Sequence, residues 1–202
     1  FFQTVTRQRG NSPGELGELF AALPNLERAF LTGALVLPPV TVPQLRELYL
    51  LGDPLSPATL AALGACQFPA LETLGMTLCS DGGPAEELEA ALALRRMAAP
   101  NLRSIDVHGV SDLMGFLDAL TQVPLPPTWS SLRMDGRVDD EDALLALLGE
   151  RAGAMASLSH LGLPLGDELS LDGEAQAKAC VEGLADREEL RDLLTPGAYD
   201  GW

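Results

Sequence analysis

Apolar side chains recur in one fixed pattern through the middle of the chain. Six segments carry apolar residues at relative positions 0, 3 and 5, and four of the six carry Gly at position 7. Successive segments begin 19 to 31 residues apart. A motif that returns at such intervals is typical of proteins built from stacked supersecondary units, so we expect an array of this kind. The segments begin at Leu26, Leu45, Leu71, Leu102, Trp129 and Leu158.

The alternation within each segment predicts a short strand. Side chains of a strand point to opposite faces in turn, so positions 3 and 5 share one face while positions 2, 4 and 6 share the other. Only the first set is apolar in every segment, which predicts that one face of the sheet belongs to the core. We expect six parallel strands that begin near Arg28, Glu47, Thr73, Ser104, Ser131 and His160.

Segments of helical length follow most of these strands. Each begins after a residue that favours a helix N-terminus. The first connection differs, because Leu37-Pro38-Pro39 favours an extended chain. Parallel strands need a crossover connection, so the alternation of strands and helices predicts an α/β fold with a parallel sheet. The predicted helices are 58–65 after Ser56-Pro57, 85–97 after Gly83-Pro84, 112–121 after Ser111, and 140–151 after Asp139.

The two ends of the chain are expected to close the array. Asn11-Ser12-Pro13 favours a helix start, and residues 2–5 could be the remaining strand of a unit that begins upstream of Phe1. The amphipathic stretches 173–184 and 186–194 predict a helical cap. The expected division is an N-terminal partial repeat or cap at 1–22, repeats at 23–165, and a C-terminal helical cap at 166–202.

The pattern LxxLxL, as in Leu45, Leu48 and Leu50, resembles the motif of the leucine-rich repeat family. The repeat length resembles that of its intracellular, helix-containing members. This resemblance implies a horseshoe solenoid with strands on the concave face and helices on the convex face, and it implies a protein partner on the concave face. The family usually has Asn or Cys at position 8, and only Cys79 matches directly, so we expect irregular repeats.

The charge of the chain narrows the range of partners. Its 202 residues include 29 acidic and 13 basic side chains, which gives a formal net charge of −16. Such a charge repels phosphate backbones and anionic lipid head groups, so we expect neither nucleic acid nor a membrane surface as a partner. No stretch approaches the roughly 20 uninterrupted apolar residues of a membrane-spanning helix.

The cysteines and the start of the chain indicate a compartment. Cys66, Cys79 and Cys180 lie far apart without CxxC spacing and cannot all pair within the chain, which favours buried thiols in a reducing environment. The start lacks a basic region followed by an apolar signal segment. These features predict a cytoplasmic protein, and the use of a single Lys beside many Arg favours a bacterial origin.

The two histidines of the sequence do not suggest a metal site. His108 and His160 are expected at outward positions two strands apart, a separation of about 10 Å that is too large for one ion. The acidic run 139–142 is explained by its place at a helix start. No phosphate-binding or dinucleotide-binding motif is present, so we expect no metal and no cofactor.

Asp106, His108, Arg133 and Asp135 are expected at outward positions of adjacent strands. With neighbouring serines they could form a Ser/His/Asp set for nucleophilic catalysis. No nucleophile elbow or oxyanion loop accompanies them, so we interpret them as a solvated polar ladder and predict no catalytic residue. The neighbouring serines are Ser104 and Ser131.

Two aromatic residues are expected at the same outward positions. Phe30, Tyr49 and Leu51 are predicted to form an exposed apolar patch, with Phe30 and Tyr49 in contact because neighbouring strands lie about 4.8 Å apart. Arg28 and Arg46 lie at its edge and would favour an acidic partner. Exposed aromatics beside charge are typical of a protein-binding surface. The alternative is that another segment of the full chain covers the rings.

Two functions remain open at this point. The first is a non-enzymatic interaction module that binds a protein partner on its strand face. The second is a substrate-recognition or regulatory domain of a larger enzyme whose catalytic part lies outside these residues. The predicted partner-binding residues are Phe30, Tyr49, Leu51, Arg28, Arg46, Asp106, His108, Arg133 and Asp135.

Overall fold

The computed structural model describes residues 14–32, 35–51, 55–78 and 84–163. Within these residues, six parallel strands form one sheet in the order of the sequence. Each strand begins at the residue that the alternating pattern predicts, and the α/β fold class with a parallel sheet is confirmed. The strands are β1 (Arg28–Thr32), β2 (Glu47–Leu51), β3 (Thr73–Thr77), β4 (Ser104–Val110), β5 (Ser131–Gly136) and β6 (His160–Gly162).

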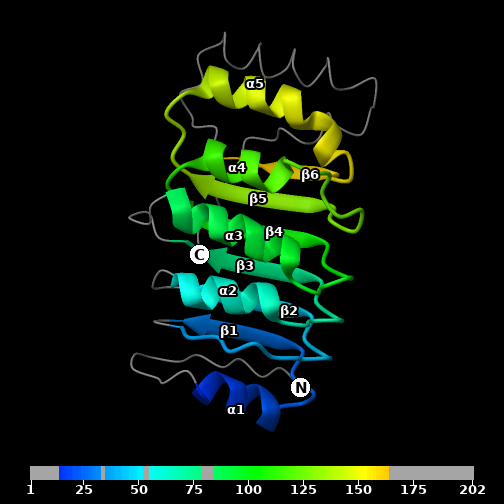
Figure 1. Cartoon of the computed structure of the whole chain (residues 1–202). Helices are drawn as coiled ribbons and strands as arrows, with labels where there is room; N and C mark the ends of the chain where they lie inside the picture. Colours follow the sequence, from blue (N-terminus) through cyan, green and yellow to red (C-terminus); the bar gives the residue numbers. More distant parts are fainter. Residues whose placement is uncertain (1–13, 33–34, 52–54, 79–83, 164–202) are drawn as a thin grey trace.

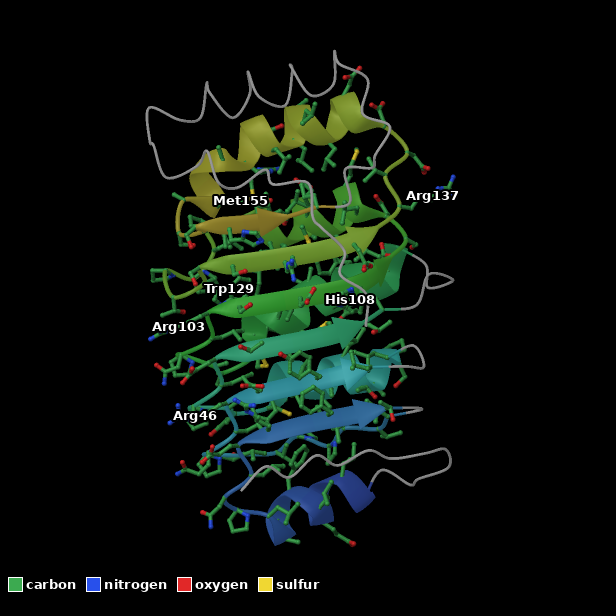
Figure 2. The ribbon with its side chains drawn as sticks, turned by 180° about the vertical axis from the view of Figure 1, so that it is seen from behind. Arg46, Arg103, His108, Trp129, Arg137 and Met155 are labelled. Atoms are coloured by element: carbon green, nitrogen blue, oxygen red, sulfur yellow. The ribbon has the colours of Figure 1, made fainter. Side chains whose placement is uncertain are left out.

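Helices cover one side of this sheet. In Figure 1, α2, α3 and α4 lie in front of the strands, and α1 and α5 lie at the two ends of the array; in Figure 2, which is turned by 180°, the strands lie in front. The described residues 35–46, between β1 and β2, contain no helix, as the proline-rich sequence predicts. The helices are α1 (Gly14–Ala22), α2 (Pro57–Ala65), α3 (Pro84–Arg96), α4 (Leu113–Thr121) and α5 (Glu141–Arg151), and a short 3-10 helix, η1 (Ala152–Met155), follows α5.

All four predicted helices begin one residue away from the expected start: α2 and α3 begin one residue earlier, and α4 and α5 begin one residue later. Asp112 caps α4 in place of Ser111, and Asp140 caps α5 in place of Asp139. Each of the two capping carboxylates accepts a hydrogen bond of 2.9 Å from the backbone N–H three residues later. At α2 the start signal at Ser56 is confirmed, because its hydroxyl accepts the corresponding hydrogen bond at 3.2 Å.

The apolar residues that define the pattern also form the core. Leu45, Leu48 and Leu50 are each at most 1% exposed, and they share the interior with helix residues such as Leu63 of α2 and Phe116 of α4. Burying one such side chain stabilises the fold by about 1.5–3 kcal/mol. The same residues therefore set the strand pattern and hold the sheet to the helices.

Neighbouring segments are joined by the same backbone hydrogen bonds at every junction. The carbonyl at position 1 of one segment accepts the N–H groups at positions 1 and 2 of the next, at 2.7 to 3.0 Å. In all six segments the N–H at position 0 donates to the carbonyl three residues earlier. These turns bring each strand into the same register with the strand before it. The accepting carbonyls belong to Glu27, Arg46, Glu72, Arg103 and Ser130.

Charged side chains of α3 reach both ends of α4. Glu87 is 2% exposed, and its carboxylate accepts the N–H groups of Ser111 and Asp112 and the Ser111 hydroxyl, the last at 2.6 Å. At the other end, Arg95 donates to the carbonyl oxygen of Leu120 at 2.7 Å. An acidic group at the N-terminus and a basic group at the C-terminus both complement the helix dipole.

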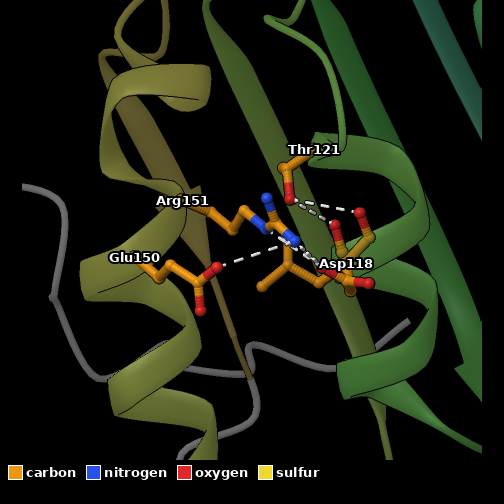
Figure 3. Close-up of polar contacts among 5 residues, drawn as sticks. Asp118, Thr121, Glu150 and Arg151 are labelled. Atoms are coloured by element: carbon orange, nitrogen blue, oxygen red, sulfur yellow. Dashed lines mark hydrogen bonds and ion pairs between the residues drawn. The ribbon is translucent and has the colours of Figure 1, made fainter.

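An ion pair connects α4 to α5 (Figure 3). The Nη2 and Nε atoms of Arg151 donate to Oδ1 of Asp118, at 2.6 and 3.0 Å. Glu150 lies farther away, with its carboxylate 3.9 Å from Arg151. Within α4, the hydroxyl of Thr121 donates to the carbonyl oxygen of Leu117 at 2.7 Å. The α4 helix is thus held by polar contacts from both neighbouring helices.

Several predictions lie outside the described residues. They concern the strand at 2–5, the start of the first helix, the C-terminal helices and the thiols of Cys79 and Cys180. Cys66 is buried as expected, and its burial raises the pKa of the thiol. In the described ranges, no helix combines the length and the apolar character that crossing a bilayer demands.

Candidate functional site

The sheet has one face that the described helices leave uncovered, which we call the open face (Figure 2). Positions 2, 4 and 6 of each segment point to it, because positions 3 and 5 point into the core. The parallel register brings equal positions of successive strands side by side. All outward residues predicted from the sequence therefore share this face, in rows that run across the strands.

At one end of the open face, Phe30 and Tyr49 form a stacked pair. Their ring centroids lie 4.6 Å apart and their planes differ by 5°, so the predicted contact is confirmed. With Leu51 they are half-buried rather than fully exposed, which corrects the prediction of an exposed patch. Phe30 is partly covered by its stack with Tyr49, and Tyr49 lies close to Gly75 on β3, where a Cβ atom would be 2.5 Å from Cδ1 of Tyr49. The Tyr49 ring therefore lies over the backbone of the next strand.

The two arginines beside this pair are not free cations. Arg28 forms an ion pair of 2.9 Å with Glu47, and Arg46 forms one of 3.2 Å with Glu72. The prediction that these arginines attract an acidic partner is weakened, because Glu47 and Glu72 already neutralise both charges. As exposed pairs they contribute little to stability.

The electrostatic environment of Tyr49 favours its neutral form. Partial burial raises the pKa of its phenol, and the carboxylates of Glu47 and Asp106 raise it further, while Arg28 acts in the opposite direction. Tyr49 therefore keeps its proton at neutral pH and offers a hydroxyl donor beside an aromatic surface.

Toward the other end of the open face, His108 lies between two carboxylates. Its Nδ1 is 2.6 Å from Oδ2 of Asp135, and its Nε2 is 3.2 Å from Oδ1 of Asp106. The hydrogen bond to Asp106 is the main cause that raises the pKa of His108 to about 9; the bond to Asp135 adds to it, and burial opposes both. His108 is therefore an imidazolium at neutral pH, with both ring nitrogens donating.

A bulge in β4 positions this cluster. The register between β4 and β5 shifts between Val107 and Val110. Gly109 has a φ of 72°, a conformation that suits glycine, and a Cβ atom there would lie 2.7 Å from the Leu78 carbonyl oxygen. The Gly109 N–H donates to Oδ1 of Asp135 at 2.6 Å. Asp135 thus holds both the bulge and the imidazolium.

Arg133 does not join this cluster. It pairs in register with Asp106, but its side chain leans toward Gly162 on β6, where a Cβ atom would lie 3.1 Å from Cγ of Arg133. The sequence placed Asp106, His108, Arg133 and Asp135 in one polar patch. The structure brings three of them together and leaves Arg133 exposed at their side.

This arrangement does not provide the parts of a Ser/His/Asp set. A general base needs a ring nitrogen with a lone pair, and both nitrogens of His108 face carboxylates. Ser104 and Ser131 lie on the same face, but no hydrogen bond joins either hydroxyl to His108 in the part of the chain that the structure describes. Across those same residues, no group of three His, Cys, Asp or Glu side chains is placed to hold a metal ion.

Sequence reasoning missed the glycines of this face. Gly75 makes room for the Tyr49 ring, Gly162 makes room for Arg133, and Gly109 forms the bulge. A signal was present, because Gly75 and Gly162 both stand at position 4, where each of the other four segments carries a side chain. A missing side chain in such a row indicates that a neighbouring side chain can lie across the gap.

Comparison with known proteins assigns no relative to this chain. No protein-family model matches its sequence. No curated protein and no solved structure matches it either.

Proposed function

We propose that this chain is a leucine-rich repeat solenoid that binds a protein partner on its open face and has no catalytic activity of its own. The sequential parallel sheet with helices on one side supports the proposed fold. The stacked pair of Phe30 and Tyr49 carries the functional proposal. It presents two large rings on the face that the described helices leave uncovered.

The core gives no reason for aromatic residues at these two positions. The buried side chains that hold the fold lie on the opposite face of the sheet, and neither ring is among them. Aromatic anchors dominate the energetics of many protein interfaces, where truncating one costs about 2 kcal/mol or more. A preformed stack also loses little side-chain entropy when a partner binds.

The test compares the proteins retained by immobilised variants of the full chain. Wild type, Phe30→Ala and Tyr49→Ala are exposed to an extract of the source cells, and retained proteins are quantified by mass spectrometry. Leu88→Ala is the matched control, because Leu88 is an apolar side chain on α3 that is 45% exposed. We expect a protein that wild type and Leu88→Ala retain equally and that both ring variants bind at least tenfold more weakly.

Thermal unfolding of the same variants separates binding from folding. We expect Phe30→Ala to melt close to wild type, because its ring contributes to the stack and not to the core. Tyr49→Ala also uncovers Gly75, so a somewhat lower melting temperature is expected there. Normal retention by both ring variants, together with much lower melting temperatures, would show that the rings serve the fold and that the interface lies elsewhere.

A further inference from the structure

A group of polar side chains on β4, β5 and β6 has no hydrogen-bond or ion-pair partner among the residues that the structure describes. Ser104, Ser131 and His160 occupy position 2 of successive strands and are paired in register, so they form a row across the open face. Arg133 stands two residues after Ser131 on the same face. Among the described residues, no hydrogen bond or ion pair satisfies the side chains of these four, which we call the donor row.

Arg133 differs in its environment from Arg28 and Arg46. Arg28 and Arg46 are neutralised by Glu47 and Glu72. The carboxylate beside Arg133 in register is that of Asp106, which faces the ring of His108 instead. Arg133 leans away from Asp106 over Gly162 and remains exposed. Asp106 is thus engaged by His108, and within the described part of the chain the guanidinium of Arg133 has no ion-pair partner.

We infer that the donor row binds the carboxylate of an Asp or Glu side chain in the protein partner, an inference that rests on the proposed function. A guanidinium offers two parallel N–H donors that fit a carboxylate, which makes such pairs strong and directional. The hydroxyls of Ser104 and Ser131 can donate to the same oxygens. In an acidic chain with a formal net charge of −16, an exposed guanidinium without a partner among the described residues attracts an anion to one specific place.

Charge favours a carboxylate over a phosphate at this place. A phosphorylated side chain carries about −1.5 to −2 charges at neutral pH, against −1 for Asp or Glu. Asp135 lies on the same strand as Arg133, and Asp106 lies on the neighbouring strand. The single positive charge of His108 offsets only one of these two negative charges. A dianion therefore meets more repulsion than a monoanion, both locally and from the whole molecule.

The distance to the aromatic pair sets the spacing in the partner. Tyr49 and Arg133 both stand at position 4, on β2 and β5, so three strand spacings separate their backbones. At about 4.8 Å per strand this is about 14 Å. An extended peptide covers that distance in about four residues. The expected partner segment therefore carries an aromatic or large apolar residue and an acidic residue about four positions apart.

Synthetic peptides provide the probe for this inference. Fluorescein-labelled peptides of ten residues carry Phe at a fixed position and Glu three, four, five or eight positions away, in an otherwise Ala- and Ser-based sequence. Matched peptides carry Gln in place of Glu. Dissociation constants for the full chain are measured by fluorescence anisotropy at fixed salt. We expect wild type to bind the Glu peptide of spacing four at least tenfold more tightly than its Gln counterpart, and to lose this preference at spacing eight.

Variants of the protein locate the effect. Arg133→Gln is expected to remove the preference for Glu over Gln, and Arg133→Glu to prefer a peptide with Lys at that place. Arg103→Gln is the matched control. Arg103 is an exposed arginine directly before β4 (Figure 2), and its substitution changes the net charge by the same amount. We expect it to keep the preference within twofold.

The outcomes separate this inference from the proposed function. If Phe30→Ala weakens all peptides while Arg133→Gln leaves the ratio of Glu to Gln binding unchanged, the open face binds peptides and the donor row does not select acids. If Arg133→Gln abolishes the ratio while Phe30→Ala changes nothing, the acid site stands and the aromatic anchor fails. Equal losses in Arg133→Gln and Arg103→Gln, tighter binding of a phosphoserine peptide, or no binding of any peptide at millimolar concentration would each overturn the inference.

Discussion

At the scale of single residues, His108 combines the largest electrostatic perturbation of the open face with a clear structural task. Its imidazolium bridges Asp106 and Asp135, and Asp135 in turn holds the N–H of Gly109. Removing the proton of His108 would leave two carboxylates with one donor fewer between them. The protonation state of this one ring is therefore coupled to the bulge in β4.

This coupling predicts a dependence of stability on pH. The folded state holds the pKa of His108 at about 9, above the ordinary value of 6.5, so folding is favoured by proton binding. The resulting stabilisation is fully present below pH 6.5 and is lost as the pH rises toward 9. Because the ring is partly exposed, we expect a loss of roughly 1–2 kcal/mol after allowance for solvent screening. Urea unfolding between pH 6 and 10 measures it.

His108→Gln is the reference for this measurement. It keeps a donor but cannot titrate, so its free energy of unfolding is expected to change less over the same interval. Parallel curves for wild type and His108→Gln would contradict the assignment of the stabilisation to this ring.

The glycine of the bulge predicts a second effect at this scale. Gly109→Ala places a side chain on a residue with a φ of 72° and brings its Cβ to 2.7 Å from the Leu78 carbonyl oxygen. Strain of this kind costs about 1–3 kcal/mol, and we expect the melting temperature to fall accordingly. Gly153→Ala is the matched control, because no atom lies within 4 Å of a Cβ added there. A Gly109→Ala variant as stable as Gly153→Ala would show that the bulge relaxes without cost.

At the scale of elements, α4 depends on side chains that belong to its neighbours. Glu87 and Arg95 of α3 satisfy backbone groups at its two ends, and Arg151 of α5 pairs with Asp118 in its middle. Groups at a helix terminus have no partner within their own helix, so each contact from outside replaces a bond that the helix cannot make itself. The order of α4 is therefore tied to the presence of α3 and α5.

Glu87→Ala tests this dependence. The substitution leaves the N–H groups of Ser111 and Asp112 without their buried acceptor, which costs about 1–3 kcal/mol. We expect hydrogen exchange to accelerate first at the start of α4. Glu89→Ala, on an exposed position of the same helix, should leave that exchange unchanged. Equal protection of α4 in both variants would show that the cap from α3 is dispensable.

The strands could be predicted from the sequence more accurately than the helix starts. The strands could be predicted to the residue, because alternation, as in Leu48 and Leu50, is a local property with a period of two. The capping residues of α4 and α5 were harder to predict, because two side chains that could cap the helix are adjacent in the sequence. At α4, the hydroxyl of Ser111 donates to Glu87, and Asp112 caps the helix. The contact between Ser111 and Glu87 joins residues 24 positions apart and leaves no local trace.

Only part of the candidate site could be predicted from the sequence. Register alone predicted that Phe30 and Tyr49 touch, since equal positions of neighbouring strands are adjacent. The choice of His108 as the partner of both aspartates was not predictable, because it depends on the bulge at Gly109 and on which way each side chain leans. The alternating pattern predicts the row of the open face in which a residue lies, whereas its contacts depend on how neighbouring side chains pack.

At the scale of the whole molecule, each described strand pairs only with the described strands that precede and follow it in the sequence. The backbone bonds that join them are the same at each of the five junctions. Stability is therefore assembled from neighbour to neighbour, and the open face is a direct product of that order. Its aromatic end and its polar end are separated because they belong to strands that are distant in sequence.

The connection between β1 and β2 shows that neighbouring strands can keep their register without a helix between them. It has no helix in its described residues, whereas later connections carry one, yet β1 and β2 pair in the same register as the other strands. Segment spacing varies from 19 to 31 residues without changing the rows of side chains on the open face. A change of length on the helical side therefore need not alter the open face. The length of a connection can thus differ from unit to unit while the strands keep their register.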